Sequence, residues 1–237
     1  MRRRSGSSLL MLRNESFAFT EKTIMKKKSS LGTDPLSRKI RNHLRESAEV
    51  KNLIADQDLS SILSAAHLIA SAFKSGGKIL LCGNGGSAAD CQHLAAELVS
   101  RLTKEFERPG LPAIALTTDT SFLTAFANDF GFVGAFERQV LTLGKPRDVL
   151  LAISTSGNSP NILRAVKAAR KIRMSTVALT GNKGHLRKLA QVSISIPSFD
   201  TQYIQEASLT IEHILCGLIE NLLFDPRAVR RKGKYDH

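Results

Sequence analysis

The sequence of 237 residues has no tryptophan, two tyrosines, seven prolines and three cysteines. The cysteines Cys82, Cys91 and Cys216 form no close pair and no zinc-finger spacing, which indicates a reducing compartment, so we expect a cytoplasmic protein. No run approaches the ~18 consecutive apolar residues of a membrane-spanning helix. With 42% hydrophobic residues the chain is too apolar to be disordered. These features predict a globular domain that needs no disulfide or metal to hold its fold.

The net charge of +13 is concentrated at the two ends of the chain. Residues 1–45 carry 12 Lys and Arg against 3 Asp and Glu, residues 224–237 carry 5 against 2, and the rest carries 17 against 16. The tails could contact phosphate polymers non-specifically, but a nearly neutral core gives no reason to expect a nucleic-acid partner. We expect a basic, disordered extension over residues 1–36, a folded domain over 37–223 and a basic tail over 224–237.

The hydrophobic pattern predicts an α/β fold. Two amphipathic helices come first, one with Ile40, Leu44 and Ala48 on one face and the second over about residues 59–73. Helical segments then alternate with apolar runs and a long helix closes the domain, so we expect a doubly wound parallel sheet of five strands covered on both faces. The runs lie at residues 79–82, 113–116, 149–153, 176–179 and 192–196, and the helices at about 87–103, 120–127, 133–142, 159–172, 184–190 and 202–223.

Two loops, residues 83–87 and 154–159, each follow a predicted strand and open a helix. Glycines allow close backbone approach, and hydroxyls and helix N-termini offer donors, so both loops suit phosphate. The alternative is that they are ordinary turns with serine caps. Neither loop has the glycine spacing of a dinucleotide site or the Gly-Lys-Ser/Thr of a P-loop. The pair of loops favours a phosphomonoester such as a sugar phosphate.

Polar side chains follow the first loop and recur on the last helix. His93 and Glu97 are four residues apart and share one helix face, as a surface contact or as an acid–base or metal pair. Arg101 lies a further turn along that face. On the last helix the polar candidates are Gln205, Glu206, Glu212 and His213, of which Gln205 and His213 are ~80° apart around the axis and could point into one cleft.

Several segments together resemble the phosphoheptose isomerases of the sugar isomerase (SIS) domain family, over roughly residues 37–223. The first and fourth segments occur in many SIS domains, whereas the combination of His and Glu with Gln and His points to the heptose enzymes. The segments are Cys82-Gly83-Asn84-Gly85-Gly86-Ser87, His93 with Glu97, Asn128-Asp129-Phe130-Gly131-Phe132, Ser154-Thr155-Ser156-Gly157-Asn158-Ser159, and Ile204-Gln205-Glu206 with His213.

The resemblance implies a flavodoxin-like fold and a homotetramer with active sites between subunits. It implies an aldose–ketose isomerase that converts sedoheptulose 7-phosphate to D-glycero-D-manno-heptose 7-phosphate, the first step of ADP- or GDP-heptose supply for cell-surface polysaccharide. Non-catalytic relatives bind a replication-initiator protein, and a sugar-phosphate sensor would keep the loops without turnover. Those alternatives are expected to lose the acid–base residues that this sequence retains.

The resemblance also implies a role for each site residue. Glu97 acts as the base and His213 as the acid, or both belong with His93 and Gln205 to the ligands of one zinc ion per subunit; the sequence leaves these two descriptions open. Two positions depart from the family pattern, Ser208 in place of a frequent histidine and Glu212 in place of a small or apolar residue. The residues implied to bind phosphate are Ser154, Thr155, Ser156 and Ser159. The residues implied to bind the rest of the substrate are Asn84, Gly85, Gly86, Ser87, Glu97, Arg101, Asn128, Asp129 and Gln205.

Overall fold

The structure, a computed structural model, describes residues 34–104 and 107–224. The expected basic extension and tail therefore lie almost entirely outside the described residues. The chain divides into two units, Met1–Ala48 and Glu49–His237. The described part of the first unit belongs to helix α2 (Pro35–Ala55), which starts where the Asp34 carboxylate accepts a hydrogen bond from the Ser37 amide (3.1 Å). The second unit contains the sheet.

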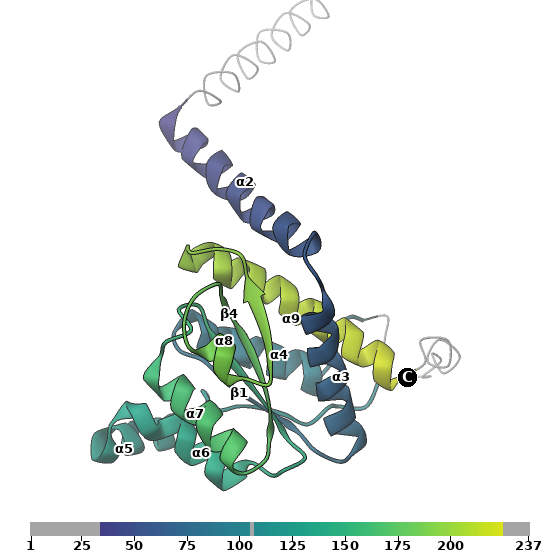
Figure 1. Ribbon diagram of the computed structural model, residues 1–237, viewed down its shortest axis with the longest axis vertical. Coiled ribbons are helices and arrows are strands. Elements are labelled where there is room, and N and C mark those ends of the chain that lie inside the picture. The colour runs from purple at the N-terminus through teal and green to yellow at the C-terminus, as the bar shows by residue number, and fades with distance from the viewer. Residues whose placement is uncertain (1–33, 105–106, 225–237) are drawn as a thin grey trace, which may run out of the picture. The chain divides into compact units, whose positions relative to one another are not determined.

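The sheet confirms the predicted fold class. Its five strands all pair in parallel, in the order β2-β1-β3-β4-β5 (Figure 1). This is the flavodoxin-like order, in which the chain switches direction across the sheet between β1 and β3. The strands are β1 (Ile79–Cys82), β2 (Ala113–Ala115), β3 (Val149–Ser154), β4 (Ser175–Gly181) and β5 (Val192–Ile196).

Helices cover both faces of the sheet because alternate strand residues point to opposite sides. Figure 1 shows α3, α4 and α9 on one side of the sheet and α6 and α7 on the other. Ile79 and Leu81 of β1 belong to the core shared with α3, α4 and α9, whereas Leu80 and Cys82 belong to the core shared with α6 and α7. The helices are α3 (Ser60–Lys74), α4 (Gly86–Val99), α5 (Thr120–Phe130), α6 (Ala135–Leu143), α7 (Pro160–Lys171), α8 (Leu186–Leu189) and α9 (Thr201–Leu223), with a short 3-10 turn η1 (Phe132–Gly134).

Helix α4 is shorter than the sequence pattern predicts. It ends at Val99 instead of about residue 103, so Arg101 is exposed beyond the helix and not one turn further along its face. The Leu98 carbonyl accepts hydrogen bonds from the Leu111 amide (3.0 Å) and from the Arg108 guanidinium (2.7 Å). These partners come from the chain returning toward β2, which a helical periodicity does not reveal.

In the described part of the chain, no helix combines the length and apolar character needed to cross a membrane.

Candidate functional site

The first predicted loop connects β1 to α4 and is shaped by its glycines. Gly85 has a φ of +55°, a conformation that side chains disfavour. A Cβ atom at Gly83 would lie 2.4 Å from the Ser87 carbonyl oxygen, so only glycine fits there. The loop therefore turns tightly into α4, whose first N–H groups point toward the carboxyl edge of the sheet.

The second predicted loop connects β3 to α7. Gly157 takes a φ of +64°, and the hydroxyls of Ser154 and Ser159 lie 3.3 Å apart. The Ser156 hydroxyl accepts a hydrogen bond from the Asn158 amide (3.3 Å) and is exposed. Since β1 and β3 are neighbouring parallel strands, both loops lie at the switch point, where α/β sheets bind ligands.

A pair of asparagine amides joins the two loops. Asn84 Nδ2 donates to Asn161 Oδ1 (3.0 Å), and Asn161 Nδ2 donates to Asn84 Oδ1 (2.8 Å). Asn161 is buried, and its Oδ1 also accepts from the Ile162 amide (3.0 Å). Asn161 was not predicted from the sequence, where its only signal is a polar residue in the first turn after the second loop. Both the Nδ2 and the Oδ1 atoms of Asn84 therefore form hydrogen bonds in this bridge.

Three side chains from two helices meet within hydrogen-bonding distance. Glu97 Oε1 lies 3.1 Å from His93 Nε2 on the same helix and 3.4 Å from His213 Nε2 on α9. The two histidine Nε2 atoms are 3.0 Å apart. Both imidazoles are about half exposed, while Glu97 is 15% exposed. We call these three residues the His–Glu–His cluster.

The donor atoms of the His–Glu–His cluster fit a metal ion. Their mutual separations of 3.0, 3.1 and 3.4 Å lie within about 0.3 Å of the spacing around a tetrahedral zinc ion, whose bonds of ~2.0–2.2 Å keep its ligands about 3.3–3.5 Å apart. Two imidazoles and one carboxylate are also a common catalytic zinc set that leaves a fourth position open. The same geometry suits proton transfer, because Glu97 Oε1 lies 3.4 Å from His213 Nε2 and the imidazole is about half exposed.

Gln205 lies against the start of α4. A Cβ atom at Gly86 would come within 2.2 Å of Gln205 Nε2 and 2.3 Å of its Oε1, so the absence of a side chain at Gly86 makes room for this amide. Gln205 Nε2 also approaches Asp90 Oδ1 at 3.5 Å. The structure therefore brings Gln205 next to the first loop. Asp90, which the sequence analysis did not single out, is its partner and lies one turn before His93.

Behind the His–Glu–His cluster lies a fully buried acid, Glu212. Both of its carboxylate oxygens are buried without a hydrogen-bond partner. Burial, and to a smaller extent the nearby carboxylates of Asp90 and Glu97, together raise the pKa of Glu212 to about 9. Glu212 is therefore a neutral acid at pH 7. This departure from the family pattern adds no negative charge to the site at that pH.

Replacement of Glu212 by Gln should change how stability depends on pH. The pKa of Glu212 in the folded protein lies above its unfolded value of ~4.3. The contribution of Glu212 to the free energy of unfolding is therefore fully present below pH ~4.3 and is lost as the pH rises to about 9. Urea unfolding of metal-free protein in EDTA should show wild type losing up to ~1.4 kcal/mol per pH unit relative to Glu212→Gln. Exposed Glu107→Gln is the control; parallel curves for wild type and Glu212→Gln would contradict the assignment.

The remaining predicted residues lie apart from the His–Glu–His cluster. Asn128 and Asp129 are exposed on α5, where Asn128 Nδ2 donates to Asp129 Oδ1 (2.9 Å). A cavity of about 450 Å³ opens beside both loops on the α5–α6 side and includes none of the three cluster residues. It is lined by Gly83, Asn84, Gly85, Ala88, Thr117, Leu123, Phe132, Val133, Phe136, Ser159, Pro160 and Asn161.

Comparison with known proteins gives one consistent match. Residues 42–181 match the family model described as SIS domain. Phosphoheptose isomerase of Aquifex aeolicus is 51% identical over 186 residues, covering 78% of this chain and 96% of that protein. The structure of phosphoheptose isomerase from Neisseria gonorrhoeae superposes with a TM-score of 0.73 at 41% identity, covering 78% and 99%, and that from Francisella tularensis with 0.75 at 38%, covering 79% and 100%.

Proposed function

The chain belongs to the phosphoheptose isomerases of the SIS domain family and is a sugar-phosphate isomerase, and on that premise we propose that it converts sedoheptulose 7-phosphate to D-glycero-D-manno-heptose 7-phosphate. The observation that carries the proposal is the meeting of Glu97 with His93 and His213, near two loops suited to phosphate. Incubating the purified protein with sedoheptulose 7-phosphate and assaying for the aldoheptose phosphate tests it directly; no product would refute it.

The proposed reaction moves a proton between adjacent carbons through an enediol. Glu97 takes the proton from C1 while His213 gives one to the C2 carbonyl oxygen, which yields the enediol. His213 then takes the O1 proton while Glu97 gives its proton to C2, so the product has an aldehyde at C1 and a hydroxyl at C2, and both residues return to their starting states. A carboxylate and an imidazole at 3.4 Å are suited to this exchange. The phosphate loops hold the far end of the sugar and keep C1 and C2 in register.

The proposal includes one zinc ion per subunit, held by His93, Glu97, Gln205 and His213. The support is that the donor atoms of His93, Glu97 and His213 lie close to the spacing of ligands around a tetrahedral ion. When bound, zinc would supply Lewis-acid polarisation of the carbonyl. The zinc and acid–base descriptions share Glu97 and His213, and chelation separates them: turnover that survives complete metal removal supports direct acid–base chemistry, and turnover restored only by zinc supports the metal.

Phosphate is proposed to bind the second loop through Ser154, Thr155, Ser156 and Ser159. Ser156→Ala removes one hydrogen bond to a charged group, which costs about 1.5–3 kcal/mol. We expect the KM for the sugar phosphate to rise roughly ten- to a hundredfold. Steady-state kinetics measure this, with Ser71→Ala, an exposed serine of α3, as the control. An unchanged KM would remove Ser156 from the phosphate site.

We also propose that the chain forms a homotetramer with active sites between subunits. Exposed apolar residues of α3 and α9 support this, since Leu63 is 48% and Ile214 43% exposed. They border an apolar groove of about 320 Å³ between these helices. Light scattering should give four times the chain mass of 25.9 kDa, and a monomer at enzymatic concentrations would oppose the proposal.

The alternatives of a replication-initiator-binding protein or a sugar-phosphate sensor are not favoured. Both would need no acid–base residues, yet Glu97 and His213 lie together here. Binding of the sugar phosphate without turnover, measured by calorimetry on the same sample, would revive the sensor.

A further inference from the structure

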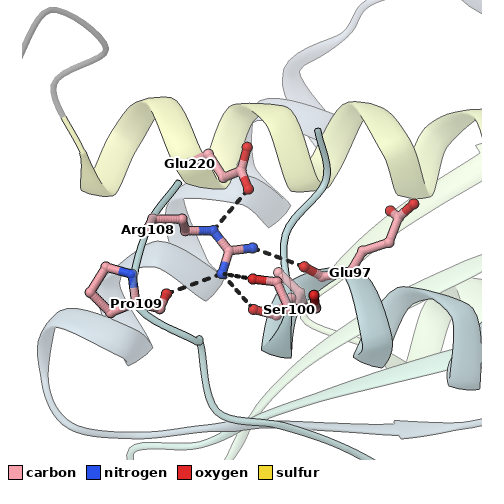
Figure 2. Close-up of polar contacts among 6 residues, drawn as sticks. Glu97, Ser100, Arg108, Pro109 and Glu220 are labelled. Atoms are coloured by element: carbon pink, nitrogen blue, oxygen red, sulfur yellow. Dashed lines mark hydrogen bonds and ion pairs between the residues drawn. The ribbon is translucent and has the colours of Figure 1, made fainter. Parts of the chain in front are cut away.

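A buried arginine links the two helices that carry the His–Glu–His cluster. Arg108 lies in the segment between α4 and β2, and its side chain is fully buried. Its Nε donates to Glu220 Oε1 of α9 at 2.8 Å (Figure 2). Removing two charges from water is costly unless further hydrogen bonds satisfy them. The remaining guanidinium nitrogens must therefore have partners.

Those partners are four backbone carbonyl oxygens, three of them at the end of α4. As Figure 2 shows, Arg108 Nη2 donates to the Glu97 carbonyl (2.9 Å), and Nη1 donates to the carbonyls of Ser100 (3.3 Å) and Pro109 (3.1 Å). Nη1 also donates to the Leu98 carbonyl (2.7 Å). The last carbonyls of a helix have no partners within the helix, and a positive charge is favourable there. Arg108 thus ends α4 and attaches it to α9.

The contact between Arg108 and α4 and the His–Glu–His cluster share one residue, Glu97. The backbone carbonyl of Glu97 contacts Arg108, while its side chain contacts His93 and His213. Glu220 follows His213 by seven residues, about two turns, so both lie on the same side of α9 ~10 Å apart along the axis. The two helices are therefore joined at two neighbouring points, by the cluster and by the Arg108–Glu220 pair.

We propose that Arg108, through Glu220, is a positioning residue that sets the spacing of α4 and α9 and so holds the donor atoms of His93, Glu97 and His213 together. Its role in turnover rests on the proposed function, whereas its role in the cluster geometry does not. Lysine cannot replace it, because a single ammonium lacks the planar fork that reaches both a carboxylate and several carbonyls.

If the Arg108–Glu220 pair only stabilised the fold, breaking it should have the same effect as breaking an ion pair elsewhere in the protein. Lys78, which is 21% exposed, and the buried Asp148 form a comparable ion pair between the starts of β1 and β3, at the edge of the sheet opposite the loops. Asp148 is 2% exposed and also accepts hydrogen bonds from the amides of Lys78 and Lys145. Asp148→Asn therefore destabilises the same fold without touching α4 or α9, and it is the matched control.

The experiment compares full-length wild type, Arg108→Lys, Glu220→Gln and Asp148→Asn at a temperature where all remain folded. Zinc affinity is measured by chelator competition. The values of kcat and KM are measured by steady-state kinetics with the sugar phosphate. We expect Arg108→Lys to lower zinc affinity and kcat at least tenfold, as loss of residues that orient ligands does, with KM within about twofold because the phosphate loops are untouched. Glu220→Gln should show a smaller change in the same direction, since a neutral acceptor keeps a weaker bond.

Histidine ring chemical shifts of the metal-free protein give a reading that needs neither zinc binding nor turnover. Resonances of His93 and His213 should move in Arg108→Lys and stay in place in Asp148→Asn. If Arg108→Lys lowers the melting temperature but leaves the ring shifts and zinc affinity at wild-type values, or if Asp148→Asn changes them equally, the positioning role is wrong. A wild type without isomerase activity would refute the proposed function alone, because the histidine ring shifts would still test the positioning role of Arg108.

Discussion

Glu97→Gln and His213→Asn are each expected to lower kcat at least a hundredfold. Positioned acid and base groups contribute ~10²–10⁴-fold to proton transfer. Glu97→Gln keeps the shape of the side chain and His213→Asn keeps a polar group, but each removes the group proposed to transfer a proton. Because Glu97 Oε1 and His213 Nε2 lie only 3.4 Å apart, the double variant should be little slower than either single variant, since groups that act as a unit are non-additive.

The phosphate loops are separate from this pair, so binding of the sugar phosphate, measured by calorimetry, should largely survive in both variants. His67→Asn, at an exposed position of α3, is the control for loss of a histidine. Wild-type turnover in Glu97→Gln, together with a changed melting temperature, would mean that Glu97 only stabilises the contact between α4 and α9.

Gly86→Ala should be nearly as damaging, although it adds a single methyl group. The new Cβ would lie 2.2 Å from Gln205 Nε2 and 2.3 Å from Oε1, well inside contact distance. The Gln205 amide must move away from the first loop, and a misplacement of about 1 Å can cost ~10²-fold in rate. We expect kcat/KM to fall roughly a hundredfold and zinc affinity at least tenfold.

Gly217→Ala on α9 is the matched control, because its Cβ would lie 3.8 Å from Leu102 Cδ2, an ordinary contact. Alanine is also the better helix former. Equal kinetics for both variants and wild type would show that the position of Gln205 does not matter to the reaction.

The sequence allowed the fold to be predicted because periodicity is a local property. Runs such as Ile79 to Cys82 are short and apolar throughout, as strands buried on both faces are. The end of α4 could not be predicted in this way. It depends on Arg108, ten residues beyond Leu98, and on Glu220, more than a hundred residues away. No repeat or spacing links these positions.

The sequence predicted some residues of the candidate site and not others. The four-residue spacing of His93 and Glu97 placed them on one helix face, and the structure has them 3.1 Å apart. That His213 joins them follows from the packing of α9 on α4, which the sequence suggested only through family resemblance. Asn161 and the burial of Glu212 were beyond reach, because a polar residue next to a loop or on a helix is usually exposed.

The Asn84–Asn161 bridge has an energetic consequence for ligand capture. Two reciprocal amide hydrogen bonds of 3.0 and 2.8 Å tie the first loop to the second within one chain. Loops that are free before binding lose conformational entropy when a ligand orders them, about 1–2 kcal/mol for each residue fixed. Here that ordering is completed during folding, so a phosphate that binds these loops as proposed would meet loops already held in place, and more of its interaction free energy would remain as affinity.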